Sequence, residues 1–347
     1  MNKPTLYALI TNKDVVSKNN GDTINEIRNM ATISSAFDVF YNNDPFCIEK
    51  DSLGSAGRIG PVGDYDFYYI RNNPEITKSI QGKKIVMGYP YDQDIFEEAS
   101  AIFVTTPNWQ THLQHRGEAS AEKLKYLYKG LLPKPKCPVV NIGQRTDAIL
   151  SEKEPSSKSI FQFRAKTTGS SVFGYYGNLS ADLYPYMAFA AVERLNREYP
   201  ELNPMVVLAG KFRKGGEISN GNIIHIGNVD YEEMPSLLDV SVATFTTESL
   251  LCNTLGSQKV LDSIARGVPV LCRRLDTFVS QLGDEYPCFY ETENQAYNLT
   301  KQLLLDPDFA AEVKIICRNR AVFHQLDNVR ERFLAQPELS ELLGSGI

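Results

Sequence analysis

Residues 258–271 read QKVLDSIARGVPVL, and this stretch contains a complete connection from a helix to a strand. Its apolar residues recur at helical spacing and would share one face: Val260, Leu261, Ile264 and Ala265. Gly267 suits the position after the last helical turn, and Pro269 prevents the helix from continuing. The apolar residues 268–271 then predict a buried strand. The stretch therefore predicts a helix that leads directly into the sheet of an α/β protein.

The same alternation of strands and helices extends along most of the chain. In the first half the strand-like runs are 5–10, 66–70, 84–88, 101–106 and 139–143. In the second half they are 172–177, 205–210, 223–229, 240–245 and 288–291. Helical patterns lie at 23–37 in the first half and at 184–200, 231–239 and 294–334 in the second. This rhythm is typical of parallel sheets covered by helices.

The rhythm stops at residues 150–168, where the sequence becomes polar, and we expect the interdomain linker there. The prediction is an α/β protein with two doubly wound, Rossmann-like domains that face a cleft. They comprise residues 1–165 and 166–325, followed by a helical tail at 326–347 that packs back on the N-terminal domain. Because ligands of such sheets bind at the carboxyl ends of the strands, the cleft is the expected site.

Composition excludes several classes of protein. The 347 residues carry a net charge of −6, which argues against a protein that binds nucleic acid through broad phosphate neutralisation. The six cysteines form no CxxC pair, so we expect reduced thiols and a cytoplasmic protein. No apolar stretch approaches the ~20 residues of a transmembrane helix, and the N-terminus does not resemble a signal peptide.

Lys259 and Asp262 lie one turn apart at the start of the predicted helix. Ser257 is the expected N-cap, and the N–H groups of the first turn attract anions. With the charge of Lys259 they would suit a diphosphate, while Asp262 would accept hydrogen bonds from the two hydroxyls of a ribose. The alternative is an ordinary solvated Lys–Asp pair at i,i+3.

Four segments in order indicate a family. VFGYYGNLS (172–180), MVVLAGK (205–211), IIHIGNVDYEEMPSLLDVSVATF (223–245) and GSQKVLDSIARGVPVL (256–271) resemble the donor half of glycosyltransferases with the GT-B fold. The resemblance is to retaining family 4, also called glycosyl transferases group 1, and covers roughly residues 170–325. It implies an acceptor-side N-terminal domain and a nucleotide-sugar-binding C-terminal domain.

The resemblance implies transfer of a sugar, of the hexosyl type, from a nucleotide diphosphate sugar to a glycan, lipid-linked or other acceptor. Configuration would be retained, in polysaccharide or glycoconjugate biosynthesis. Lys259 would stabilise the leaving diphosphate and Glu248 would bind hydroxyls of the transferred sugar. The expected donor-binding residues are Gly177, Asn178, Lys211, Gly227, Asn228, Val229, Lys259 and Asp262. The expected acceptor-side residues are Gly21, Tyr89 and Asp92.

The chain departs from the family pattern at three places. Asp262 replaces the usual Glu, and Asn178 and Ser180 replace a basic pair. Glu248 is not at the usual spacing of the paired-Glu motif, where Thr254 stands instead. Two alternatives therefore stay open: a non-catalytic GT-B-like partner subunit, and a nucleotide-sugar epimerase of the same fold.

Two further patterns bear on metals and membranes. The triplets Asp64-Tyr-Asp66 and Asp92-Gln-Asp94 are the pattern that holds a divalent metal in the other large glycosyltransferase fold. Such triplets also arise by chance in acidic chains, and GT-B enzymes usually need no metal, so we expect no cofactor. The lysine-rich stretch 122–136 would suit a peripheral contact with the inner membrane face, or a solvated helix and loop.

Overall fold

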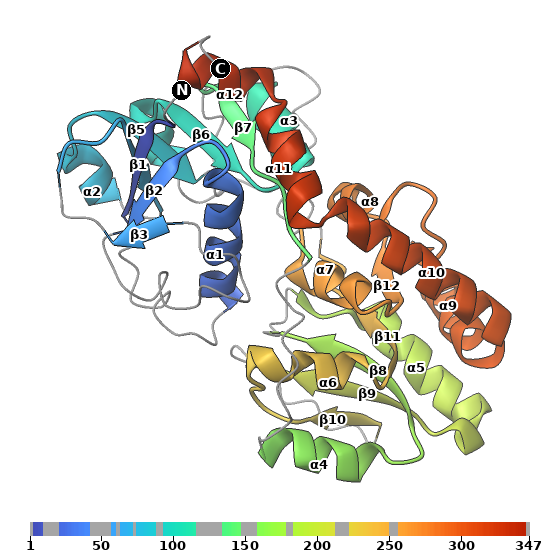
Figure 1. Cartoon of the computed structure of the whole chain (residues 1–347). Helices are drawn as coiled ribbons and strands as arrows, with labels where there is room; N and C mark the ends of the chain where they lie inside the picture. Colours follow the sequence, from blue (N-terminus) through green and yellow to red (C-terminus); the bar gives the residue numbers. More distant parts are fainter. Residues whose placement is uncertain are drawn as a thin grey trace. The chain divides into compact units, whose positions relative to one another are not determined.

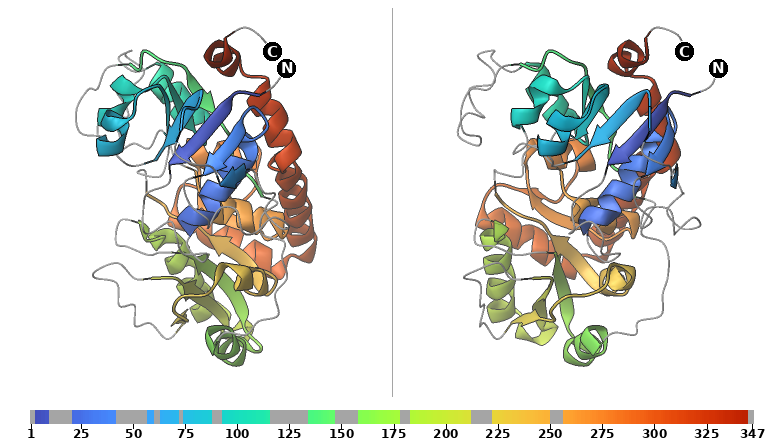
Figure 2. Two further views of the ribbon diagram at one scale, coloured as in Figure 1. Left: turned by 60° about the vertical axis from the view of Figure 1, so that its left-hand side comes forward. Right: turned by 90° about the vertical axis from the view of Figure 1, so that its left-hand side faces the viewer.

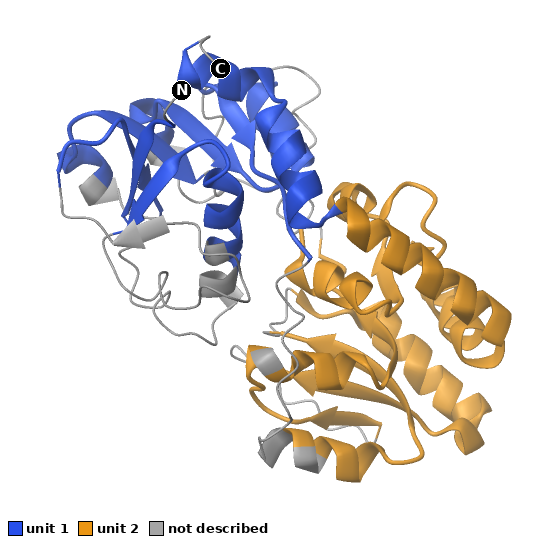
Figure 3. Cartoon of the chain, viewed as in Figure 1, with its two compact units in different colours: residues 1–148, 324–347 blue, residues 149–323 orange. Residues whose placement is uncertain are grey.

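The fold is described from a computed structural model of the chain. The structure describes residues 3–9, 21–41, 57–59, 63–71, 74–87, 93–115, 134–146, 158–177, 183–211, 222–249 and 256–344. The chain forms two compact units (Figure 3), which we call unit 1 (residues 1–148 and 324–347) and unit 2 (residues 149–323). Each unit is built on its own parallel sheet.

Unit 1 contains a seven-stranded sheet in the order β3-β2-β1-β4-β5-β6-β7 (Figure 1), with all neighbouring strands parallel. Its strands are β1 (Thr5–Leu9), β2 (Asp38–Tyr41), β3 (Gly57–Ile59), β4 (Phe67–Ile70), β5 (Lys83–Met87), β6 (Ala101–Val104) and β7 (Val139–Asn141). Its helical segments are α1 (Gly21–Ile33), α2 (Pro74–Ser79), η3 (Gln93–Glu98), α3 (Pro107–Gln114), α11 (Leu326–Leu334) and α12 (Pro337–Leu343).

Both faces of the unit 1 sheet are buried. Ile85 and Phe103 enter one apolar cluster, whereas their strand neighbours Val86 and Ile102 enter another on the opposite face. Successive side chains of a strand point to opposite faces, and helices cover both sides of a parallel sheet. This arrangement explains why the strands read as continuous apolar runs rather than as alternating patterns.

Unit 2 contains a six-stranded parallel sheet in the order β10-β9-β8-β11-β12-β13. Its strands are β8 (Ser171–Tyr176), β9 (Pro204–Ala209), β10 (Ile223–His225), β11 (Ser241–Phe245), β12 (Val270–Arg273) and β13 (Phe289–Tyr290). Its helical segments are α4 (Lys158–Thr167), α5 (Tyr186–Glu198), η7 (Pro200–Leu202), η8 (Tyr231–Glu233), α6 (Met234–Leu238), α7 (Gln258–Ala265), α8 (Asp276–Leu282), α9 (Glu293–Leu305) and α10 (Pro307–Phe323).

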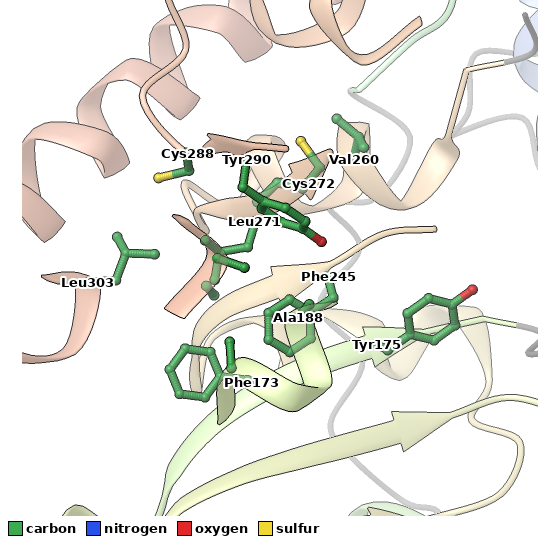
Figure 4. Packing of buried hydrophobic residues seen from close by; sticks show 14 of the residues in the cluster. Phe173, Tyr175, Ala188, Phe245, Val260, Leu271, Cys272, Cys288, Tyr290 and Leu303 are labelled. Atoms are coloured by element: carbon green, nitrogen blue, oxygen red, sulfur yellow. The ribbon is translucent and has the colours of Figure 1, made fainter. Parts of the chain in front are cut away.

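Aromatic side chains fill the centre of unit 2. Phe173 of β8 stacks on Phe245 of β11, with ring centres 5.8 Å apart, and Val260 of α7 belongs to the same cluster. Tyr175 belongs to it as well, and Figure 4 shows its hydroxyl directed away from the labelled apolar residues. The core therefore fixes the strands that carry the candidate site described below.

The last helices of the chain pack on unit 1. Phe333 of α11 and Leu339 of α12 lie in the core of unit 1, and the Arg330 guanidinium donates to the Ala31 carbonyl of α1 at 3.0 Å. Figure 1 and the two further views in Figure 2 show α11 (red) beside α1 (blue). Unit 1 is therefore discontinuous in sequence.

The division of the chain differs from the predicted one. The first unit boundary lies after Ala148 rather than at 165, and the chain returns to unit 1 at His324 rather than at 326. Helix α4 occupies the stretch that we expected to be the linker, and its Ile160 and Phe163 are buried in a cluster of unit 2. Two buried apolar residues among polar neighbours are too few to give a clear helical period.

Candidate functional site

The candidate site lies at the carboxyl ends of β8 and β11 in unit 2. These strands are adjacent at the centre of the sheet, with β9 and β10 on one side and β12 and β13 on the other. The strand order therefore reverses between them, and ligands of doubly wound sheets bind at such a reversal. Gly177 follows the last residue of β8, and Thr246, Thr247 and Glu248 follow β11.

Helix α7 is fastened beside these strand ends by hydroxyl and amide groups. The Ser263 hydroxyl contacts Thr244 Oγ1 of β11 at 2.7 Å and the Lys259 carbonyl at 2.8 Å. The Gln281 side chain of α8 bonds to both the N–H and the carbonyl of Ser257, each at 3.0 Å. Ser257 is the N-cap residue, as expected, but its side chain makes no capping hydrogen bond.

Lys259 extends from the first turn of α7 to the end of β8. Its Nζ donates to the Tyr175 hydroxyl at 2.9 Å and lies 4.2 Å from the centre of that ring. At Gly177, which has a φ of +142°, a Cβ atom would lie 2.3 Å from Lys259 Cε. The positive φ favours glycine, and a side chain at position 177 would displace the lysine from its place. The structure thus brings these two predicted donor residues together.

Asp262 lies one turn further along α7. It is 6% exposed, and its Oδ1 accepts hydrogen bonds from the Tyr231 hydroxyl at 2.9 Å and from Gln258 Nε2 at 2.8 Å. Asp262 and Lys259 line one small cavity of about 10 Å³, close to the space that a single water needs. The Tyr231 and Gln258 side chains thus hold the carboxylate in a fixed orientation, one helical turn from Lys259.

Glu248 lies at the amino end of α5. Its two carboxylate oxygens accept from the Met187 and Ala188 N–H groups at 3.1 and 3.0 Å, and Oε1 also accepts from the Tyr290 hydroxyl at 2.8 Å. Burial and the adjacent carboxylate raise the pKa of Tyr290 well above its usual value. Pro185, the N-cap residue of α5, makes no side-chain cap, so Glu248 caps that helix from a distant loop. Its contact with a transferred sugar stays a prediction.

The other expected donor residues follow β9 and β10 at the same edge of the sheet. Gly210 N–H, next to the exposed Lys211, donates to the Gly227 carbonyl at 2.8 Å. Gly227 has a φ of +79° and open space around the position of a Cβ atom. Asn228 is exposed, whereas Val229 is half-buried against an apolar cluster. The backbone turns sharply here, as a close approach to a ligand requires.

Several predicted residues cannot be placed in this way. Asn178, Tyr89 and Asp92 lie outside the described residues, as does most of the lysine-rich stretch 122–136. Gly21 is the first residue of α1.

Three residues of the site were not predicted from the sequence: Tyr175, which holds Lys259, and Tyr231 and Gln258, which hold Asp262. No local signal marks the two tyrosines, because each acts on a residue far along the chain.

Among the DxD residues, Asp66 has a structural contact. Its carboxylate accepts from the Thr5 N–H at 2.7 Å and the Thr5 hydroxyl at 2.8 Å, and these hydrogen bonds lower its pKa. It thereby joins the start of β1 to β4.

Within the described ranges no three His, Cys, Asp or Glu side chains form a group that could hold a metal ion. No helix in these ranges is long and apolar enough to cross a bilayer.

Comparison with known proteins identifies the fold. No protein-family model matches the chain, and no curated protein sequence matches it significantly. Among solved structures, HepE from Anabaena, crystallised with UDP and glucose, matches with a TM-score of 0.61 and 12% identity over 99% of this chain and 100% of that one. Trehalose 6-phosphate synthase from Burkholderia multivorans matches with a TM-score of 0.64 and 9% identity, and sucrose-phosphate synthase from Thermosynechococcus elongatus with a TM-score of 0.62 and 12% identity. Both matches also cover 99% of this chain and 100% of the other. The predicted fold class, that of GT-B glycosyltransferases with two Rossmann-like domains, is confirmed.

Proposed function

We propose that the protein is a glycosyltransferase that takes a sugar from a nucleotide diphosphate sugar. The observation that carries the proposal is the position of Lys259. Its ammonium lies against Gly177, where β8 ends at the reversal of strand order, and Asp262 is held one turn away. A cation for a diphosphate and a carboxylate for a ribose are the two groups that such a donor requires.

In the proposed reaction an acceptor hydroxyl oxygen forms a bond to the anomeric carbon of the donor sugar. The bond from that carbon to the diphosphate oxygen breaks, and the proton of the hydroxyl leaves with the nucleotide diphosphate or passes to water. Negative charge grows on the diphosphate as the bond breaks. Lys259 and the first-turn N–H groups of α7 stabilise this charge without rearrangement, because Tyr175 already holds the ammonium in place.

The finer parts of the proposal follow the family resemblance. The transferred group is a hexose, its configuration is retained, and no metal takes part. The acceptor is a glycan, a lipid-linked sugar or another acceptor in polysaccharide or glycoconjugate biosynthesis in the cytoplasm. A peripheral contact of the lysine-rich stretch 122–136 with the inner membrane face stays a prediction, and so does its alternative, a solvated helix and loop. The UDP and glucose in HepE, and the sugar phosphates named for the two synthases, support a sugar donor and a sugar acceptor.

The first test is release of nucleotide diphosphate from a panel of nucleotide sugars, with and without simple sugars as acceptors, for the wild type and Lys259→Ala. We expect the variant to lose at least tenfold in turnover, since it lacks the charge-assisted contact to the leaving group. Lys301→Ala is a matched control, because Lys301 also lies over a tyrosine ring, that of Tyr199, in unit 2. Equal release by the wild type and Lys259→Ala would rule out this site.

The same assay separates the alternatives. An epimerase would return an altered nucleotide sugar without transfer. A partner subunit would bind the nucleotide without turnover. That result would agree with the contacts of Glu248, whose carboxylate caps α5 and is therefore already occupied. Chelation of divalent metals tests the expectation that no metal is needed.

A further inference from the structure

Helix α1 of unit 1 has a buried face that changes character along its length. Glu26, Asn29, Met30 and Ile33 recur at helical spacing and are all buried. Met30 and Ile33 enter the apolar core of unit 1, as expected for this face. One turn nearer the start of the helix, the same face carries a carboxylate and an amide instead. Such polar groups in a buried stripe need partners.

One partner comes from the end of a strand. Arg71 Nη1 donates to Glu26 Oε2 at 2.8 Å, and the two side chains are 4% and 0% exposed. Arg71 follows Ile70, the last residue of β4, which pairs with Leu9 at the end of β1. The strand order of unit 1 reverses between β1 and β4 (Figure 1). The ion pair thus lies at the reversal, where a doubly wound sheet binds its ligand.

Among the side chains that helix α1 contributes to this cluster, two atoms have no hydrogen-bond partner in the part of the chain that the structure describes. They are Glu26 Oε1 and Asn29 Nδ2, both fully buried. Side chains three residues apart on a helix have Cβ atoms roughly 5–6 Å apart, so one small group can reach both. One atom accepts hydrogen bonds and the other donates them, and a buried group of either kind is unfavourable while it stays unpaired.

We infer that this cluster binds a hydroxyl group of a neutral, polyhydroxylated ligand such as a sugar. A hydroxyl can donate to Glu26 Oε1 and accept from Asn29 Nδ2 at the same time. The Arg71–Glu26 pair has no net charge, and Glu26 presents a carboxylate oxygen, which repels a phosphate. Arg28 lies about 200° around the helix from Glu26 and belongs to another face. Identifying the ligand as the acceptor rests on the proposed function.

The experiment measures binding of neutral sugars to the full chain by calorimetry or ligand-observed NMR. The probes are glucose, galactose, mannose and N-acetylglucosamine, with glucose 6-phosphate and inorganic phosphate as charged counterparts. We expect at least one neutral sugar to bind, and to bind better than glucose 6-phosphate. Asn29→Ala should weaken it about fivefold, and Glu26→Gln about tenfold or more, since the latter bond involves a charge. Association should be slow, because both atoms are covered.

Lys84→Gln is the matched control, because it removes an ion pair of unit 1, Lys84–Glu98, that lies outside the cluster. It should leave sugar binding unchanged. Asn29→Ala keeps the Arg71–Glu26 pair intact, so it tests the site even if Glu26→Gln unfolds. The inference is overturned if no neutral sugar binds, if the phosphorylated sugar binds best, or if Asn29→Ala binds like the wild type. Binding of UDP, measured separately and compared with Lys259→Ala, tests the proposed function independently.

Discussion

The position of Lys259 depends on Tyr175. The tyrosine accepts the hydrogen bond of the ammonium and also offers its ring face, so Tyr175→Phe would remove the first contact and keep the second. We predict that this variant folds normally and that its KM for the nucleotide sugar rises about tenfold, since a hydrogen bond to a charged group is lost. Steady-state kinetics over a range of donor concentrations measure the effect.

Tyr176→Phe is the matched control for that variant. Its hydroxyl is bonded to Ser241 Oγ at 2.7 Å and to the Leu237 carbonyl at 3.2 Å rather than to Lys259. It should lower thermal stability and leave the KM for the donor unchanged. If both tyrosine variants have the same KM as the wild type, Tyr175 does not position the lysine.

Glu248 acts on stability through the contacts that it makes with α5. Glu248→Ala removes the acceptor of two backbone N–H groups and leaves the buried Tyr290 hydroxyl unpaired. We predict a loss of about 3 kcal/mol in the free energy of unfolding, measured by urea denaturation. Glu248→Gln keeps one acceptor oxygen and should lose less. A stable Glu248→Gln protein without turnover would instead assign Glu248 to the sugar, as the family resemblance implies.

At the scale of elements, α7 ends in a Schellman motif. Val268 N–H donates to the Ser263 carbonyl and Gly267 N–H to the Ile264 carbonyl, both at 2.9 Å. Gly267 has a φ of +71°, and a Cβ atom there would lie 2.6 Å from Arg318 Nε of α10. We predict that Gly267→Ala costs about 2 kcal/mol of unfolding free energy, from backbone strain and from displacement of Arg318.

Gly169→Ala separates those two contributions. Gly169 follows α4 with a φ of +75°, and no atom lies within 4 Å of the position of its Cβ. This variant should lose about 1 kcal/mol, from strain alone. Equal losses for the two variants, measured by the same thermal or urea unfolding, would mean that the contact with Arg318 costs nothing.

Elements whose signals are local could be predicted from the sequence. Helix α7 and strand β12 follow from apolar spacing, Gly267 and Pro269, and the core strands β8, β9 and β11 follow from their apolar runs. Strand β3, in the glycine-rich segment around Gly57–Ile59, has too few apolar residues to show a period. Its pairing with β2 depends on how the whole sheet assembles, and no short window of sequence predicts this pairing.

At the scale of the whole molecule, the candidate site was predictable only in part. Gly177, Lys259 and Asp262 belong to ordered motifs, and the structure places them near one another. Their partners lie far along the chain: Tyr175 is 84 residues from Lys259, and Glu248 is 60 residues from Ala188. Only the fold specifies such contacts. For the same reason, periodicity could not assign the capping role of Glu248.

The return of the chain to unit 1 protects an edge of its sheet. Strand β7 is the last strand of the seven-stranded order, and the Gln336 side chain bonds to both the N–H and the carbonyl of Asn141, at 2.7 and 2.6 Å. The amide thus pairs with the edge strand as another strand would. We predict that Gln336→Ala speeds hydrogen exchange at the Asn141 amide at least tenfold, because this amide loses its acceptor.

Gln114→Ala is the control for the Gln336 variant. It breaks a bond of 2.8 Å to Glu338 of α12 without touching the backbone of β7. In Gln114→Ala, the hydrogen-exchange rate of the Asn141 amide should equal that of the wild type. In both variants, the exchange rates in the unit 2 sheet should equal those of the wild type. If Gln336→Ala leaves Asn141 as protected as before, the apolar contacts of Phe333 and Leu339 alone hold the end of the chain on unit 1.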